Sequence, residues 1–446
     1  MWLIIFATIV LVTIGMSFRR PGIALGLVMV MFGLEQFLQT RAAIFVSNSK
    51  IINLGIGTAL LISSAVWISK NARAIKIDSM HALVLSLATL AFASRLWTLA
   101  PGQFDNYMKS AIPYFVLFLG LAPLISMDKK GIKQGIWTAL YLGMPLVILL
   151  VFVVTWEGRG IRMAAPVLFK GRLSFSSPPL ALASMAAQTG MLAIILVPKN
   201  KLLRAVQFGV FALAAYIAYR TQSRGQLIAL GLVTLVCYPV ANQGAKLKGM
   251  LVTTGGLVVL SSLLFVVFSS LDLGTINRWN DVSVEHAIEG RGEMVKALLF
   301  EWIQSNPGYI AVGLGACSAF KTSGFYVHNL PGEILGEYGL VGASLFIAIY
   351  YQVFVKSIRI LKKLEHYPDM RREAVLVIAL FLFNTIISQK QGSFYSWPHL
   401  FFFAIAISHL ERHSRKFVAR EKSLRQMLWA TFSMQQQTST PSPYRQ

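Results

Sequence analysis

Charged residues and cysteine are scarce in this sequence. Only 13% of its 446 residues are charged and 55% are hydrophobic, whereas a water-soluble domain of this size needs a larger charged surface. Acidic residues are the rarer of the two charged classes, with 18 Asp and Glu against 41 Lys and Arg. The two cysteines, Cys237 and Cys317, lie in an apolar run and in a polar loop, which argues against a disulfide framework.

Motifs for metals and nucleotides are also missing. The chain contains no Asp-x-Asp, which weighs against a metal-bound sugar-phosphate site. Gly313-x-Gly315 lacks a third glycine and a following Lys-Ser/Thr, so it does not support a nucleotide loop. The formal net charge of +23 could indicate a nucleic-acid partner, but the placement of the basic residues explains it without one. We therefore expect no cofactor, no metal and no nucleic acid.

Long apolar runs occupy most of the chain. A helix needs about 17–25 such residues to cross a bilayer, and about thirteen segments approach this length, the first and the last two being short. They are Trp2–Met16, Pro21–Phe37, Ile51–Ser69, Met80–Ala100, Ala111–Ser126, Gly135–Thr155, Pro179–Val197, Ala205–Tyr219, Gln226–Ala241, Met250–Leu271, Ile334–Val355, Val375–Ser388 and Trp397–His409. The sequence predicts an all-α polytopic bundle of about 12–13 spans. Residues 1–410 form its membrane domain, and residues 411–446 form a basic, partly disordered cytoplasmic tail.

Basic residues alternate from loop to loop between these runs. Most of the 41 lie in Arg19–Arg20, Lys70–Lys76, Lys129–Lys133, Lys199–Arg204, Lys246–Lys248, Lys356–Arg372 and Arg412–Arg445. Loops rich in Lys and Arg stay on the cytoplasmic side, so the intervening loops should face outward. This pattern predicts a multi-pass protein of the bacterial inner membrane with a cytoplasmic C-terminus.

The longest outer loop, residues 272–332, separates spans 10 and 11. Long loops without structure of their own are uncommon unless they form a lid or a site, so we expect short helices in it. The segment Glu293–Gln304 places Met294, Leu298 and Ile303 at near-helical spacing. It predicts an amphipathic helix over the membrane surface.

Ionisable residues near the spans gather at the outer level. Such groups are costly in a membrane, so they are candidates for a functional site. They are Glu35, Arg95, Arg220, Arg224, Arg291, His328, Glu333 and Glu337. Glu35 and Arg95 could form a structural pair, and the other residues indicate a site that opens outward.

The segment Val327–Gly342 resembles the signature of the O-antigen ligase and O-antigen polymerase family. In that family a His-Asn pair, here His328-Asn329, precedes a helix with Glu-x-Gly-x-x-Gly. Ser223-Arg224-Gly225 is similar to its Ser-Arg-Gly at an outer turn. Gly290-Arg291, followed by a helix, is similar to its large-loop pattern. The matching order covers residues 179–356, whereas Pro331-Gly332 departs from the bulky residues usual in the family.

The resemblance implies transfer of a glycan from undecaprenyl diphosphate to an acceptor hydroxyl at the periplasmic face, without nucleotide or metal. The family's essential residues carry over to Arg224, Arg291 and His328 as catalytic residues. Arg220, Asn329, Glu333 and Glu337 are then expected to bind substrate. Besides the lipid bilayer, the implied partners are the lipid-linked glycan, an acceptor that is a glycan, lipid A core or a protein, and the polysaccharide assembly machinery.

These residue types suit that chemistry. Arginine remains charged and can hold two phosphate oxygens at once, so it stabilises a departing diphosphate. Histidine titrates nearest neutral pH and can remove the proton of the acceptor hydroxyl. A single displacement would invert the anomeric centre.

Other interpretations remain open at this point. Arg224 could extend to the membrane interface as flanking arginines do, and a histidine before a helix is often a capping residue. The leading alternative function is a transporter or flippase of lipid-linked oligosaccharide. Transporters usually have ionisable groups near the bilayer midplane, whereas here they collect at the outer rim. A non-catalytic scaffold of a secretion complex would tolerate the loss of His328.

Overall fold

Helices form the regular structure of this protein. The computed structural model describes residues 2–48, 50–156, 163, 178–198, 200–242 and 281–438. Its α-helices are α1 Trp2–Ser17, α2 Gly22–Gln39, α3 Ala43–Ser47, α4 Lys50–Asn71, α5 Ser79–Ala93, α6 Pro101–Phe115, α7 Ala122–Ser126, α8 Lys129–Phe152, α9 Pro179–Ile195, α10 Lys201–Arg220, α11 Arg224–Asn242, α13 Asp281–Ile303, α14 Pro307–Val312, α15 Ala319–Ser323, α16 Leu330–Lys363, α17 Pro368–Ser388 and α18 Pro398–Thr438. Shorter turns are η1 Ala72–Ala74, η2 Ser94–Leu96, the π-helical η3 Val116–Leu121 and η4 Phe394–Ser396.

Several of these helices are long and apolar enough to cross a membrane. Among the described residues, eight helices qualify by length and composition, and Ile5–Ser17 and Pro179–Ile195 are shorter apolar helices. The eight are Gly22–Gln39, Lys50–Asn71, Ser79–Leu96, Pro101–Ser126, Lys129–Phe152, Lys201–Arg220, Arg224–Asn242 and Leu330–Lys363. The all-α, multi-pass class is confirmed. The total of 12–13 spans stays a prediction, and the expected span Met250–Leu271 lies outside the described residues.

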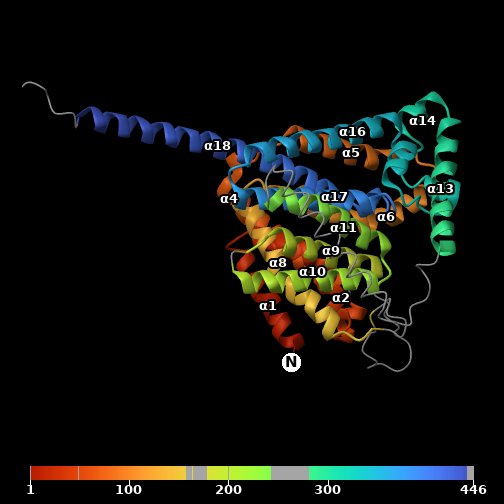
Figure 1. The fold of residues 1–446 in the computed structure, drawn as a ribbon. Coiled ribbons are helices and arrows are strands. Elements are labelled where there is room, and N and C mark those ends of the chain that lie inside the picture. The colour runs from red at the N-terminus through yellow and green to blue at the C-terminus, as the bar shows by residue number, and fades with distance from the viewer. Residues whose placement is uncertain are drawn as a thin grey trace, which may run out of the picture.

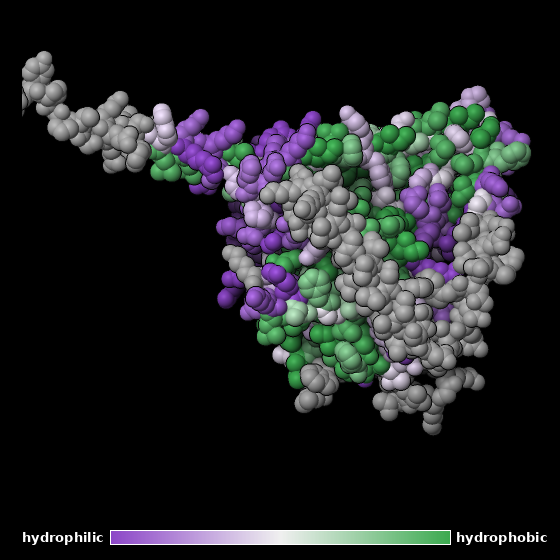
Figure 2. Space-filling model, in the orientation of Figure 1, coloured by the Kyte–Doolittle hydropathy of each residue, from purple (hydrophilic) through white to green (hydrophobic). Residues whose placement is uncertain are grey.

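The bundle is built around α2. The apolar window of α2 is 83% buried, against 28–56% for the other candidate spans, because α8, α9 and α4 pack around it. Elsewhere large apolar side chains remain on the surface, among them Leu54 and Phe152, each 71% exposed. Figure 2 shows apolar surface over the middle of the bundle and polar surface near the base of α18 and beside α13. This distribution fits a bundle whose sides face lipid.

Helix α13 lies across one end of the bundle, roughly perpendicular to the spanning helices (Figure 1). Leu298 and Trp302 are buried there, and Met294 packs beside them. The expected amphipathic helix is therefore present, but it begins at Asp281. Ile303 is 63% exposed, so its assignment to the apolar face was wrong. The helix ends at Ile303, one residue before the expected end, and Asn306 then caps the next helix, α14, through the amide of Tyr309.

A sharp bend in α16 receives the loop after α14. Gly339 has φ 61° and ψ −159°, a conformation that only glycine adopts without strain. The bend frees two carbonyls of α16, and the amides of Leu314 and Gly315 donate to Gly336 and Glu337 at 3.0 and 2.9 Å. The loop that leads to His328 is thereby fixed to the helix that follows it.

Replacing this glycine should destabilise the protein strongly. A Cβ atom at Gly339 would lie 2.4 Å from the Gly313 nitrogen and 2.6 Å from the Ala311 oxygen, both backbone atoms that cannot turn away. We expect Gly339→Ala to lower the free energy of unfolding by at least about 2 kcal/mol, measured by thermal unfolding in detergent. Gly231→Ala is the matched control, because nothing lies within 4 Å of that position in α11. Equal stability of the two variants would contradict the role of the bend.

Helix α18 leaves the opposite end of the bundle as one long rod (Figure 1). It continues to Thr438, so most of the segment expected as a partly disordered tail is helical in the structure. Near the base of this rod, Glu411 pairs with Lys363 at 2.8 Å and with Arg415. Residues 439–446 lie outside the described part of the chain.

Candidate functional site

The segment between α17 and α18, residues 389–396, is the meeting point of the candidate site. Asn329 caps α16 by accepting from the Gly332 amide at 2.9 Å, and its Nδ2 donates to the Gln389 carbonyl at 3.1 Å. From α11, Gln226 Nε2 donates to Gln391 Oε1 at 2.8 Å. The first turns of α11 and α16 are thus held on the same short segment.

Lys390 lies in this segment directly over Gly225. A Cβ atom at Gly225 would be 1.8 Å from both Cε and Nζ of Lys390, so the lysine can hold this position only beside a glycine. This contact gives a physical reason for the glycine of the Ser223-Arg224-Gly225 motif. It also places the ammonium group beside the first turn of α11.

Lys390, Arg224 and Arg291 form a cationic cluster. Burial first, and then the charges of Arg291 and Arg224, lower the pKa of Lys390 to about 8. The ion pairs among the described residues lie elsewhere in the protein, so none of them neutralises Lys390 or Arg291. The cluster also lies where α11 begins, and helix N-termini favour negative charge. Such an arrangement is suited to an anion with several charges.

His328 lies beside this cluster in an unusual backbone conformation. Its φ is 53°, which is uncommon for a residue other than glycine, and such conformations are concentrated at functional sites. Its ring packs on Tyr326 with centroids 4.2 Å apart. Burial, and then the charge of Arg291, lower the pKa of His328 below its usual range. Its buried Nδ1 has no hydrogen-bond partner among the described residues. A neutral imidazole with an unpaired nitrogen can take part in proton transfer.

The glutamates predicted to bind substrate hold the backbone of the site. Both oxygens of Glu333 accept from the Phe394 amide at 3.0 Å, and Glu333 is only 2% exposed. Glu337 is 1% exposed and accepts from the amides of Cys317 and Ala319 at 2.9 and 3.1 Å. The structure thus gives these carboxylates and Asn329 a positioning role, while their direct contact with substrate stays a prediction.

Arg220 contacts aromatic rings. Its guanidinium carbon lies 4.7 Å from the centroid of Trp156 and 5.9 Å from that of Tyr216, and it donates to the Tyr216 hydroxyl at 3.1 Å. These contacts hold the turn between α10 and α11. A contact between Arg220 and substrate remains a prediction.

The expected pairing of Glu35 with Arg95 was wrong. Arg95 forms two hydrogen bonds with Asp105, of 2.7 and 2.9 Å. Glu35 instead accepts from Asn53 at 3.0 Å and from Gln39 at 3.2 Å. Asp105 lies one turn into α6, the helix that follows Arg95 in the chain.

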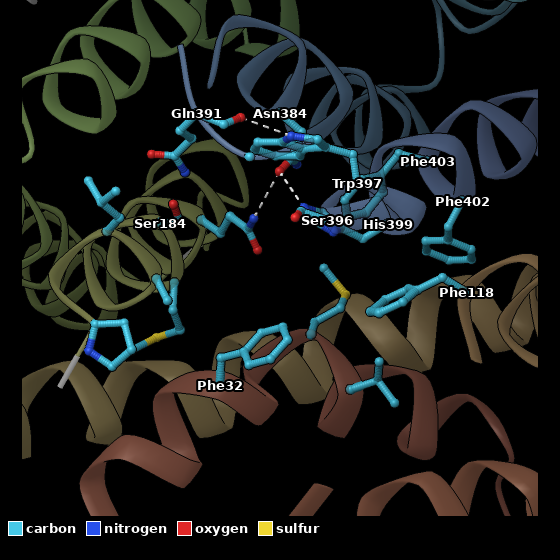
Figure 3. Close-up of a pocket in the computed structure, with 18 of the residues that line it drawn as sticks. Phe32, Phe118, Ser184, Asn384, Gln391, Ser396, Trp397, His399, Phe402 and Phe403 are labelled. Carbon is cyan, nitrogen blue, oxygen red and sulfur yellow. Dashed lines mark hydrogen bonds between the residues drawn. The ribbon is translucent and has the colours of Figure 1, made fainter. Parts of the chain in front are cut away.

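A cavity of about 330 Å³ opens beside His328. One wall carries aromatic side chains, including Phe32 and Phe118, and the other carries Asn384, Ser396 and His399 (Figure 3). None of the described residues that line it is Asp, Glu, Lys or Arg. The cationic cluster therefore adjoins a neutral space, with His328 between them.

Potential metal ligands lie together at the other end of the bundle. Asp78, His81 and His409 each offer one ligand atom, and these atoms lie within 4.8 Å of one another. Arg412 already pairs with the Asp78 carboxylate at 3.1 Å, and Lys356 donates to Ser408 beside it at 2.6 Å. These two cations oppose the binding of a divalent ion there.

Sequence reasoning missed Lys390. The available signal was its position in a short loop that the basic pattern predicts to face outward, on the side that the positive-inside rule depletes of lysine. Its motif partner, Gly225, is 165 residues away, so no local pattern joins the two.

Substituting Gly225 tests the cluster without removing any charge. In Gly225→Ala the added methyl group meets the flexible end of Lys390, which can move aside, so we expect a change in stability below about 1 kcal/mol. For the glycan transfer that the motif resemblance predicts, the displaced ammonium group should reduce kcat/KM by about 100-fold, since a misplacement of 1 Å can have that effect. Transfer rates and thermal unfolding measured on one preparation would check both values; unchanged turnover would contradict the importance of the Lys390 position.

Comparison with known proteins does not assign this chain to a family. No protein-family model matches the chain, and no curated protein matches it. The likeness of Val327–Gly342 to the O-antigen ligase and polymerase signature therefore stands on the motif residues.

Proposed function

We propose that this protein is a glycosyltransferase that moves a glycan from undecaprenyl diphosphate to an acceptor hydroxyl. The single observation that carries the proposal is the cluster of Lys390, Arg224 and Arg291 next to His328. Like charges repel, so a protein that brings three cations together at one place favours an anion between them. A diphosphate provides that charge.

The departing diphosphate gains negative charge in the transition state. In the proposed reaction the bond between the anomeric carbon and the phosphate oxygen breaks, and its electron pair stays on the diphosphate. Two guanidinium groups and one ammonium group are donors placed before the reaction begins, which is the arrangement that stabilises developing charge best. No metal ion is required to balance that charge.

The incoming hydroxyl must lose a proton as it attacks. Its oxygen forms the new bond to the anomeric carbon, and its proton passes to a nitrogen of His328. Because the pKa of His328 is lowered, the imidazole is neutral at pH 7 and ready to accept that proton. One displacement inverts the anomeric centre.

The setting of the reaction is part of the proposal. The basic loops predict that the α13 end of the bundle faces the periplasm, and the cluster lies at that end. Surface polysaccharide biosynthesis, either as polymerisation or as ligation to lipid A core, fits a site there. The acceptor's identity distinguishes these activities.

A reconstituted assay tests the proposal. Purified protein in detergent is given a radiolabelled undecaprenyl-diphosphate oligosaccharide as donor. Parallel reactions contain one acceptor each: the same lipid-linked oligosaccharide without label, lipid A core, or a protein. We expect an extended or ligated product in the presence of EDTA and without nucleotide. If no acceptor yields product while proteoliposomes move the labelled lipid between leaflets, the transporter alternative is correct.

A further inference from the structure

The cavity beside His328 differs from the cationic cluster in its chemistry. It is formed by residues far apart in the sequence, from α2, α9, the 389–396 segment and α18. It lacks formal charge among the described lining residues, so a diphosphate would gain nothing by entering it. Its volume of about 330 Å³ is within the range of small-ligand sites.

One wall of the cavity carries polar side chains. Asn384 Oδ1 lies 3.0 Å from His399 Nε2 and 3.5 Å from Gln188 Nε2 (Figure 3). Trp397 Nε1 donates to the Gln391 carbonyl at 3.0 Å, which turns the indole ring along the same wall. Polar side chains inside a membrane domain are costly and usually have a function.

The opposite wall is aromatic. Phe32 from α2 and Phe118 from η3 face Asn384, Ser396 and His399 across the space (Figure 3). A sugar ring has an apolar C–H face and a polar hydroxyl edge, and it can satisfy both walls at once. Asn384 is hydrogen-bonded within the protein, since its Nδ2 donates to the Leu380 carbonyl at 2.7 Å and its Oδ1 faces His399 and Gln188. An isoprenoid chain would contact the aromatic wall alone and would make no use of the polar wall that this network holds in place.

We infer that this cavity holds a neutral saccharide unit of the acceptor, with its attacking hydroxyl toward His328. The inference rests on the proposed transfer, because it assigns the second substrate of that reaction to a subsite. It separates the two substrates by charge: the donor diphosphate binds at Lys390, and the neutral acceptor binds in the cavity. His328 lines the cavity and is also within electrostatic reach of Arg291, so it is placed between them.

Binding can be measured without turnover. Saturation-transfer NMR on the detergent-solubilised protein would use the methyl glycosides of glucose, galactose, N-acetylglucosamine and rhamnose, with farnesol as the apolar probe. Gln188→Leu and Asn384→Leu remove polar groups from the wall at similar volume, and Ala181→Trp fills the space. Thr234→Val is the matched control, because Thr234 is a buried polar residue of α11 that does not line the cavity.

We expect at least one glycoside to bind, with affinity lowered about five- to tenfold in Gln188→Leu and unchanged in Thr234→Val. Ala181→Trp should abolish that binding. The inference is overturned if no glycoside binds the wild-type protein, or if farnesol binds instead and loses affinity only in Ala181→Trp. If glycosides bind as expected but no transfer occurs in the reconstituted assay, the subsite stands as a saccharide site and the proposed enzyme function fails.

Discussion

His328→Ala should reduce kcat for glycan transfer by about 100- to 10,000-fold, the usual contribution of a positioned general base. In the proposed site other residues hold the donor diphosphate, so its apparent KM should change little. The measurement is initial rate against donor concentration in the reconstituted assay. Thermal unfolding of the variant is needed beside it, because His328 adopts a strained backbone conformation and its replacement can also alter the loop.

A matched substitution separates catalysis from folding. His413→Ala removes a histidine from α18, at the far end of the bundle from the cluster, and should leave transfer at the wild-type rate. Retention of turnover in a well-folded His328→Ala protein would refute the assignment of the general base.

Lys390→Met should reduce kcat/KM for the lipid-linked donor by about 100- to 1,000-fold, as the loss of one preorganised donor to a developing anion does. Methionine keeps most of the length of the side chain and removes only the charge. Lys321→Met, at an exposed lysine of α15 near the same end, is the control and should have no effect on transfer. Equal transfer activity of Lys390→Met and Lys321→Met would refute a role of Lys390 in donor binding.

The pH profile gives an independent check on both residues. The base must be neutral. On the acid side, kcat/KM should therefore fall as the pH drops through the lowered pKa of His328. On the alkaline side, Lys390 loses its charge as the pH rises through its pKa of about 8, and donor binding weakens. In Lys390→Arg the alkaline limb should move to higher pH, because arginine stays charged. If the alkaline limb of Lys390→Arg lies at the same pH as that of the wild-type protein, the limb reports the titration of another group.

Much of the fold could be predicted because helix formation in a membrane follows local apolar length. The expected segments that lie among the described residues each fall on a helix, and the amphipathic helix of the long loop is α13. The errors concern side-chain partners, as with Arg95, and single positions on a helix face, as with Ile303. Hydropathy fixes which residues are helical, but it does not fix which neighbour a side chain meets.

The candidate site was only partly predictable for the same reason. The motif Val327–Gly342 identified His328, and its glutamates were expected near substrate. The structure instead gives both glutamates backbone amides as partners: Glu333 accepts from Phe394 of the 389–396 segment, and Glu337 accepts from Cys317 and Ala319. The contacts of Glu337 arise because the bend at Gly339 brings the 313–319 loop onto α16. Neither the bend nor the loop contact has a signal in the spacing of residues alone.

The sequence by itself determined the class of this protein, the number of apolar runs and the distribution of basic loops, since each depends on composition over short stretches. Only the tertiary structure decided that Lys390 lies over Gly225, that the cluster adjoins His328, and that a neutral cavity with one polar wall lies beside them. These features join residues more than 150 positions apart. They arise from helix packing, which depends on the shapes of surfaces that form only when the whole bundle has assembled.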